Sequence, residues 1–271
     1  MPKLFSFLAS ASLSLLCLAC THVGANNPRK KVRNSPNHYN DLELAEIRDN
    51  RIPQQIKQYE GFIVNFNASN RTPNFVGWEL LGSETSGETS RSNKFWRDET
   101  VKNCPSSTDY IRSGYDRGHM FPAADAKWSK ESMEQCFTMA NMCPQVHALN
   151  SGAWKTLEKK ERLWARRDSA LVIIAGPVYQ KSDTERIGQA GVRVPSGFFK
   201  AMIAPYLPEP RGIAFLYPND RAPGNMQNYA LSIDDLEKII GFDLFAALPD
   251  SIENQIESTF NFNKWNRQAT R

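Results

Sequence analysis

The chain has 271 residues, enough to bury a substantial core within one sizeable domain. With 41% hydrophobic and 23% charged residues, its composition is that of an ordinary soluble globular protein. The formal net charge of +4 is too small to argue for a nucleic-acid partner by itself, so recognition of a polyanion would have to come from local arginines. The sequence contains no internal repeat and no long low-complexity run.

The first 25 residues have the pattern of a secretory signal peptide. Lys3 supplies the charged start, residues 4–19 are apolar or small, and Val23-Gly24-Ala25 is an acceptable cleavage site. The apolar run is short for a membrane span. We therefore expect an exported protein, periplasmic or secreted. A lipoprotein signal ending at Cys20 is the alternative, although Cys17 stands where that signal has an aliphatic residue.

The segment after the signal is polar and carries a cluster of basic residues (Arg29, Lys30, Lys31 and Arg33). We expect residues 26–50 to form a linker or flexible leader and residues 51–271 to form the folded domain.

Periodicity predicts the following elements in the first half of that domain. Residues 61–67 and 74–81 are β-branched and aromatic segments joined by a dense turn signal, which is typical of a hairpin. Ser129 caps a predicted helix to Cys136, a strand follows over residues 137–142, and a long helical pattern covers residues 147–166.

The second half adds strands and two more helices. Residues 170–175 form a continuous apolar run that ends at Gly176-Pro177, as a central strand does. Further strands are predicted over residues 198–204 and 212–217, and helices over 232–240 and 251–260. The order predicts an α+β fold with a mainly antiparallel sheet and helices packed on it.

Three cysteines follow the predicted signal: Cys104, Cys136 and Cys143. An exported chain could form one disulfide among them and leave one thiol over, but two or three buried thiols are the simpler interpretation. Their spacing is not that of a zinc site.

Histidine is scarce after the signal, with only His38, His119 and His147. His119 follows an arginine and a glycine, at a place where backbone can approach a ligand. An imidazole with a pKa near 6.5 suits a general base at neutral pH. A lone histidine is nevertheless more often structural than catalytic.

One face of the long predicted helix is polar. At 100° per residue, Asn150, Glu158 and Arg162 can share one broad face, beside the apolar Trp154 and Leu157. Taken alone, Glu158 and Arg162 would be an ordinary surface ion pair, and Asn150 a mildly unfavourable helix residue.

In combination these segments resemble a known family. Their order is Arg91-x-x-x-Phe95, Asp116-Arg117-Gly118-His119, Asn141-x-x-Pro144-Gln145 and Asn150-x-x-x-Trp154-x-x-Leu157-Glu158-x-x-x-Arg162. From about Tyr59 to Phe260 the chain resembles the DNA/RNA non-specific endonuclease family, which includes secreted bacterial nucleases and mitochondrial endonuclease G. The spacing from Asn141 to Arg162 is the specific part of the resemblance.

The resemblance implies a ββα-metal motif and a metal-dependent hydrolysis of phosphodiester bonds in both DNA and RNA, with 5′-phosphate products. By position, His119 resembles the general base. Asn150 resembles the single protein ligand of a Mg²⁺ ion, for which Mn²⁺ could substitute. Glu158 resembles the acid that holds a metal-bound water. The sequence does not show whether a protein inhibitor binds the chain, nor what its oligomeric state is.

The same resemblance assigns three arginines to the substrate. Arg91 resembles the residue that stabilises the phosphate in the transition state, although it lies in a variable loop with Arg97 nearby. Arg117 and Arg162 resemble accessory phosphate-binding residues. Asp116 is interpreted as structural, shaping the turn before the histidine, and the alternative is that it orients an imidazole.

Three other functions are weighed against this one. The first is a non-catalytic nucleic-acid-binding protein on the same scaffold, and the second is a surface lipoprotein anchored at Cys20. The third is a zinc hydrolase that uses His119, His147 and the cysteines, which the spacing disfavours.

Overall fold

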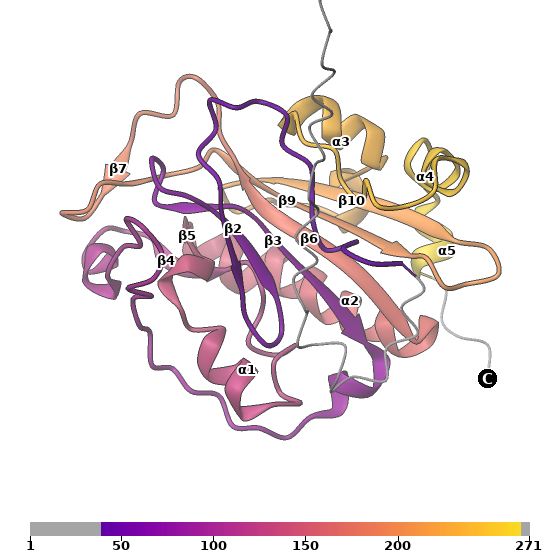
Figure 1. Ribbon diagram of the computed structural model, residues 1–271, viewed down its shortest axis with the longest axis horizontal. Coiled ribbons are helices and arrows are strands. Elements are labelled where there is room, and N and C mark those ends of the chain that lie inside the picture. Colours follow the sequence, from indigo (N-terminus) through magenta and orange to yellow (C-terminus); the bar gives the residue numbers. More distant parts are fainter. Residues whose placement is uncertain (1–38, 267–271) are drawn as a thin grey trace, which may run out of the picture.

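The computed structural model describes residues 39–266 (Figure 1). The predicted signal peptide, Cys20 and the basic cluster at residues 29–33 lie outside the described residues. Within residues 39–266, no helix is long and apolar enough to span a membrane.

A seven-stranded sheet forms the centre of the fold, and every neighbouring pair of its strands is antiparallel. The α+β prediction with a mainly antiparallel sheet is confirmed. In spatial order the strands are β1 (Gln55–Gln58), β2 (Ile63–Asn67), β3 (Thr72–Leu81), β6 (Ala170–Val178), β9 (Gly197–Ala204), β10 (Arg211–Pro218) and β11 (Ala230–Leu231).

Both faces of this sheet are covered, which explains why β6 is a continuous apolar run. Successive side chains of a strand point to opposite faces. Ile173 accordingly belongs to the larger buried cluster, and its neighbours Val172 and Ile174 belong to a second one.

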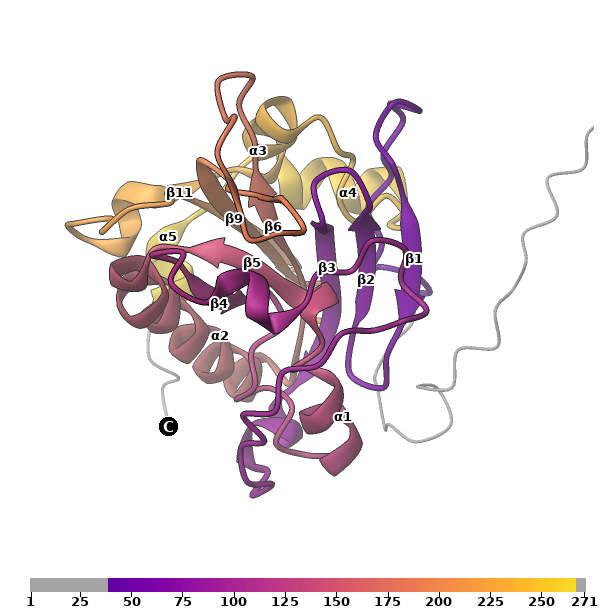
Figure 2. The ribbon, with the colours of Figure 1, turned by 90° about the vertical axis from the view of Figure 1, so that its left-hand side faces the viewer.

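The helices divide between the two faces of the sheet (Figure 2). The larger cluster contains side chains of α1 (Lys130–Gln135), α2 (Lys155–Asp168) and α5 (Phe262–Asn266). The second contains side chains of α3 (Ile233–Ile240) and α4 (Asp250–Glu257). Thus α2 and the pair α3–α4 lie on opposite faces of the sheet.

Several short elements complete the fold. Two small two-stranded sheets are formed by β4 (Asp116–His119) with β5 (Met142–Gln145), and by β7 (Arg186–Ile187) with β8 (Val192–Arg193). The 3₁₀ turns are η2 (Gly82–Ser86), η3 (Ser107–Tyr110), η4 (Met139–Asn141) and η6 (Met226–Tyr229), and the π-helical turn is η5 (Leu149–Trp154).

The strand predicted over residues 137–142 is wrong. The chain instead makes the turn η4 and then pairs as β5. The cause is the buried side chain of Asn141, whose amide nitrogen donates to the carbonyls of Phe121 and Cys136 and whose oxygen accepts from the Phe121 N–H, all at 2.9 Å. These bonds satisfy backbone groups of Phe121 and Cys136 and hold the turn against both segments.

Part of the segment expected to be a linker is packed. Leu42 is fully buried and Ile47 is 8% exposed, both in the second cluster, and Glu46 pairs with Asp243 through backbone hydrogen bonds. Apolar side chains within this polar run therefore dock it against the second cluster. The cysteines Cys104, Cys136 and Cys143 are free and buried.

Candidate active site

The Asp116–His119 run is strand β4, and its partner is β5, which follows the Asn141 turn. Gly118 lies opposite Cys143 in this pair. A Cβ atom at Gly118 would lie 2.5 Å from Oε1 of the Gln145 side chain, closer than van der Waals contact permits. The glycine is therefore required for packing between the two strands rather than for approach to a ligand.

The helix predicted over residues 147–166 is interrupted before α2. The π-helical turn η5 precedes α2, and Gly152 inside it has non-helical backbone angles (φ −104°, ψ −107°). Such turns widen a helix locally and are frequent at functional sites. The indole N–H of Trp154 donates to the His119 carbonyl at 3.4 Å, and so η5 packs directly against β4.

Asp116 joins the strand to this turn. Its Oδ2 accepts a hydrogen bond from Nδ2 of Asn150 at 2.9 Å and lies 2.8 Å from Nδ1 of His147. Asp116 does contact an imidazole, but that of His147 rather than that of His119. The bond to Nδ2 fixes the Asn150 amide so that its Oδ1 is left as an acceptor.

These elements enclose one cavity of about 610 Å³. It is lined by all six residues that the resemblance placed in the site: Arg91, Arg117, His119, Asn150, Glu158 and Arg162. Lys155 also lines it, so cationic side chains outnumber the anionic Asp116 and Glu158 by two. A concave surface with this excess of positive charge attracts phosphate groups.

His119 is the least solvated of these residues, with 9% of its surface exposed. Its ring lies edge-on to Phe137, with centroids 4.9 Å apart, and beside Phe95. Burial, and then the positive charge of Arg91, lower the pKa of His119 to about 3, although a hydrogen bond to the Arg117 backbone opposes them. The ring is neutral at pH 7, and its Nε2 has no hydrogen-bond partner among residues 39–266.

The donor set fits a hard divalent cation. Asn150 offers a neutral oxygen held in place by Asp116, and the half-buried Glu158 carboxylate has no hydrogen-bond partner within the described chain. Burial raises the pKa of Glu158, and the nearby Lys200 partly offsets that effect. Mg²⁺ characteristically takes one or two protein oxygens and keeps several waters, so this set suffices.

The three arginines are held in different ways. Arg117 donates to the Ser107 carbonyl at 2.8 and 3.2 Å, and its guanidinium lies 5.0 Å from the centroid of the Phe95 ring. Arg162 donates to the buried Asp125 at 2.8 Å. Each keeps further N–H groups for a ligand.

Arg91, not Arg97, is the loop arginine of the cavity. The Arg91 guanidinium lies 5.0 Å from the centroid of the Phe137 ring, next to His119. Arg97 is instead paired with Glu99 at 3.3 Å.

Sequence reasoning missed Lys155 and Asp125, and it did not predict that His147 contacts Asp116. Lys155 lies on the cavity because it is three residues before Glu158 and seven before Arg162, a helical spacing that could have revealed it. Asp125 contacts Arg162 and His147 contacts Asp116, both distant in sequence, and no local pattern signals these contacts.

The fold and cavity together define a protein of the ββα-metal type, in which two antiparallel strands and a following helix surround one ion site. The sequence model of the family described as DNA/RNA non-specific endonuclease matches residues 45–251. The chain belongs to this family.

Individual relatives agree with that assignment. "Nuclease EXOG, mitochondrial" of Danio rerio is 31% identical over 209 residues, which cover 70% of this chain and 60% of the relative. "Nuclease" of Nostoc sp. is 32% identical over 212 residues, or 73% of this chain and 75% of the relative. The chain therefore spans less than two thirds of some curated relatives.

A solved structure has the same fold. It is described as "Crystal structure of the EndoG/EndoGI complex: Mechanism of EndoG inhibition" and superposes with a TM-score of 0.70. The two sequences are 24% identical, and the match covers 80% of this chain and 93% of the other.

Proposed function

We propose that this chain is an exported endonuclease that hydrolyses phosphodiester bonds of both DNA and RNA with the aid of Mg²⁺. One observation carries the proposal: a single basic cavity contains a neutral histidine with an unpartnered Nε2, an oriented asparagine oxygen and an unpartnered carboxylate. These are the groups that hydrolysis of a phosphodiester requires, since water must be deprotonated and charge at phosphorus relieved.

Asn150 would hold the ion directly, and Glu158 would hold a water beside it. When bound, Mg²⁺ supplies charge neutralisation at the phosphate and assistance to the leaving 3′-oxygen. Mn²⁺ offers the same coordination chemistry.

His119 would accept the proton of the attacking water through Nε2. In the free protein, Arg91 contributes to the low pKa of His119. A phosphate bound at Arg91 would offset that positive charge, so substrate binding itself would make the imidazole a stronger base. Bound phosphate would offset only the contribution of Arg91, because burial is the larger cause of the low pKa of His119.

The arginines would bind phosphate oxygens, for which the forked guanidinium is suited. Contacts to phosphate position a nucleic acid without reading its sequence. Cleavage of DNA and RNA alike follows from a cavity whose cationic side chains are Arg91, Arg117, Lys155 and Arg162.

The test is cleavage of supercoiled plasmid and of total RNA, each with Mg²⁺ and with a chelator. We expect His119→Ala to lower both rates at least a few hundredfold, the usual contribution of a general base. His147→Ala is the matched control and should retain most of the activity, because His147 is exposed and does not line the cavity. Undiminished cutting in chelator would refute the metal requirement, and near-normal rates for His119→Ala would remove this residue from the proposed role.

The competing functions give different results. A non-catalytic binding protein would shift the plasmid on a gel without nicking it. A zinc hydrolase would contain tight stoichiometric zinc, yet among residues 39–266 the acids and metal-binding side chains that gather at ligand distance do not include His119, His147 or a cysteine. Export is tested by the mass of the mature N-terminus, which would begin after Ala25 or at a lipidated Cys20.

A further inference from the structure

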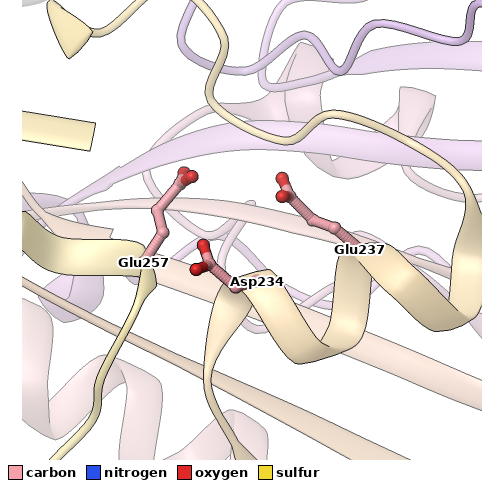
Figure 3. A group of neighbouring side chains, drawn as sticks. All are labelled: Asp234, Glu237 and Glu257. Atoms are coloured by element: carbon pink, nitrogen blue, oxygen red, sulfur yellow. The ribbon is translucent and has the colours of Figure 1, made fainter. Parts of the chain in front are cut away.

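A second cluster of ligands lies on the other side of the sheet from the cavity. Asp234 and Glu237 of α3 and Glu257 of α4 each offer one carboxylate oxygen, and these atoms all lie within 4.8 Å of one another. Figure 3 shows the three carboxylates gathered in one space between the two helices. Nothing in the proposed nuclease mechanism uses them.

Glu257 is the residue of this cluster whose environment indicates a bound ligand. Only 3% of its surface is exposed, and its Oε1 is buried with no hydrogen-bond partner among the described residues. A buried carboxylate without a donor is costly unless it is paired, coordinated to a metal or protonated. Glu237 of α3 faces the same space. Its Oε1 accepts a hydrogen bond from the Leu244 N–H at 2.6 Å, which holds the carboxylate in place.

The surroundings do not neutralise the cluster. The cavity of about 390 Å³ that contains it is lined by six acidic residues and a single basic one, Arg48. Arg48 is already committed to Glu46 at 2.9 Å and Asp243 at 2.6 Å.

We propose that Asp234, Glu237 and Glu257 bind a divalent cation, Ca²⁺, which fastens α3 to α4 against the sheet. Carboxylate oxygens are the ligands of hard cations, and a Ca²⁺ ion binds oxygens at about 2.4 Å. Two ligands on opposite sides of one such ion are then about 4.8 Å apart, a separation that the three carboxylates do not exceed.

Calcium suits this set better than the alternatives. Mg²⁺ requires a tighter octahedron with oxygens at about 2.1 Å and releases its waters reluctantly. Zinc and copper prefer imidazole or thiolate, and the cluster contains neither. Water can complete the coordination, because Asp234 and Glu237 are only partly buried.

The experiment uses the Asn150→Ala chain, which removes the ligand of the proposed catalytic ion and leaves the second cluster intact. Ca²⁺ is titrated by calorimetry, and thermal unfolding is recorded in Ca²⁺ and in chelator. We expect one Ca²⁺ per chain and a Tm rise of about 5–10 °C at a hundredfold excess over Kd. Mg²⁺ at the same concentration should produce a smaller rise.

Two substitutions in this background locate the ion. Glu257→Gln should weaken Ca²⁺ binding at least tenfold and abolish the Tm rise. Asp235→Asn is the matched control and should change neither, because Asp235 is an exposed neighbour on α3 paired with Lys238. Asp234→Asn serves as a second cluster variant if Glu257→Gln does not fold.

The proposal is overturned if the Asn150→Ala chain binds no Ca²⁺, or if Glu257→Gln and Asp234→Asn bind it as the parent does. In that case protonation of Glu257 would account for its burial. A larger Tm rise with Mg²⁺ than with Ca²⁺ would overturn the choice of calcium. None of these results depends on nuclease activity.

Discussion

Substitution of Asp116 tests whether Asn150, the proposed metal ligand of the cavity, is oriented by a residue that does not itself contact the ion. Removing its carboxylate as Asp116→Ala deletes the acceptor that holds Nδ2 of Asn150 at 2.9 Å. The amide is then free to rotate, and Oδ1 no longer faces the ion in every molecule. Binding of Mg²⁺ must therefore bear the free energy of ordering this side chain.

The expected magnitude follows from that single bond. A hydrogen bond to a charged acceptor contributes about 1.5–3 kcal/mol. Loss of a group that orients a metal ligand typically weakens metal binding about 10–100-fold, which corresponds to about 1.4–2.7 kcal/mol. The two ranges agree, so we expect the half-saturating Mg²⁺ concentration to rise about 10–100-fold.

The assay is the initial rate of plasmid nicking over a Mg²⁺ titration. For Asp116→Ala the half-saturation point should shift, and the rate at saturating Mg²⁺ should fall less than about tenfold, because His119 and the arginines are untouched. His147→Ala removes the other partner of Asp116 and leaves the bond to Asn150 in place. An unshifted Mg²⁺ titration for Asp116→Ala, or an equal shift for His147→Ala, would refute the reasoning.

Further predictions concern stability and salt. Because the pKa of His119 is lowered to about 3, the unfolded chain gains a proton near pH 6.5 that the folded chain does not bind, and stability is lost as pH falls from 6.5 toward 3. Between pH 7 and pH 5, the free energy of unfolding measured in urea should fall by about 2 kcal/mol less for His119→Gln than for the parent. Equal falls for the two chains would contradict this prediction. Lys200→Met should destabilise the chain by about 3–5 kcal/mol, since it leaves Glu161 buried and unpaired, whereas adding Glu161→Gln should recover part of the loss in the same assay. Arg117→Gln should lower the slope of log affinity for DNA against log salt by about one; an unchanged slope would argue against a phosphate contact.

The central sheet was predictable because its pattern is local. The apolar run of β6 and the hairpin of β2 and β3 depend on residues adjacent in sequence. The starts of α1 and α3 were predictable for the same reason, since Ser129 and Ser232 each cap the helix that follows.

The break before α2 was not predictable in this way. The helical pattern continues through Gly152, so periodicity alone extends the helix over the turn. What distinguishes the turn is tertiary: Asn150 is bound by Asp116, and Trp154 by the His119 carbonyl, both more than thirty residues away in sequence. The six cavity residues could be named from the family resemblance, but the contacts that orient them could not.

The two ion sites proposed for this chain differ in the net charge of the surrounding side chains, and this difference predicts different roles for the two ions. The cavity around His119 has more cationic than anionic side chains, so it favours a dication only when phosphate arrives to balance the charge. The cluster at Glu257 lies among acids, with its one arginine already paired, so it favours a dication at all times. The first ion should therefore bind together with substrate and the second before it. A brief chelator treatment should stop cleavage at once, whereas thermal stability should fall only as the second ion dissociates.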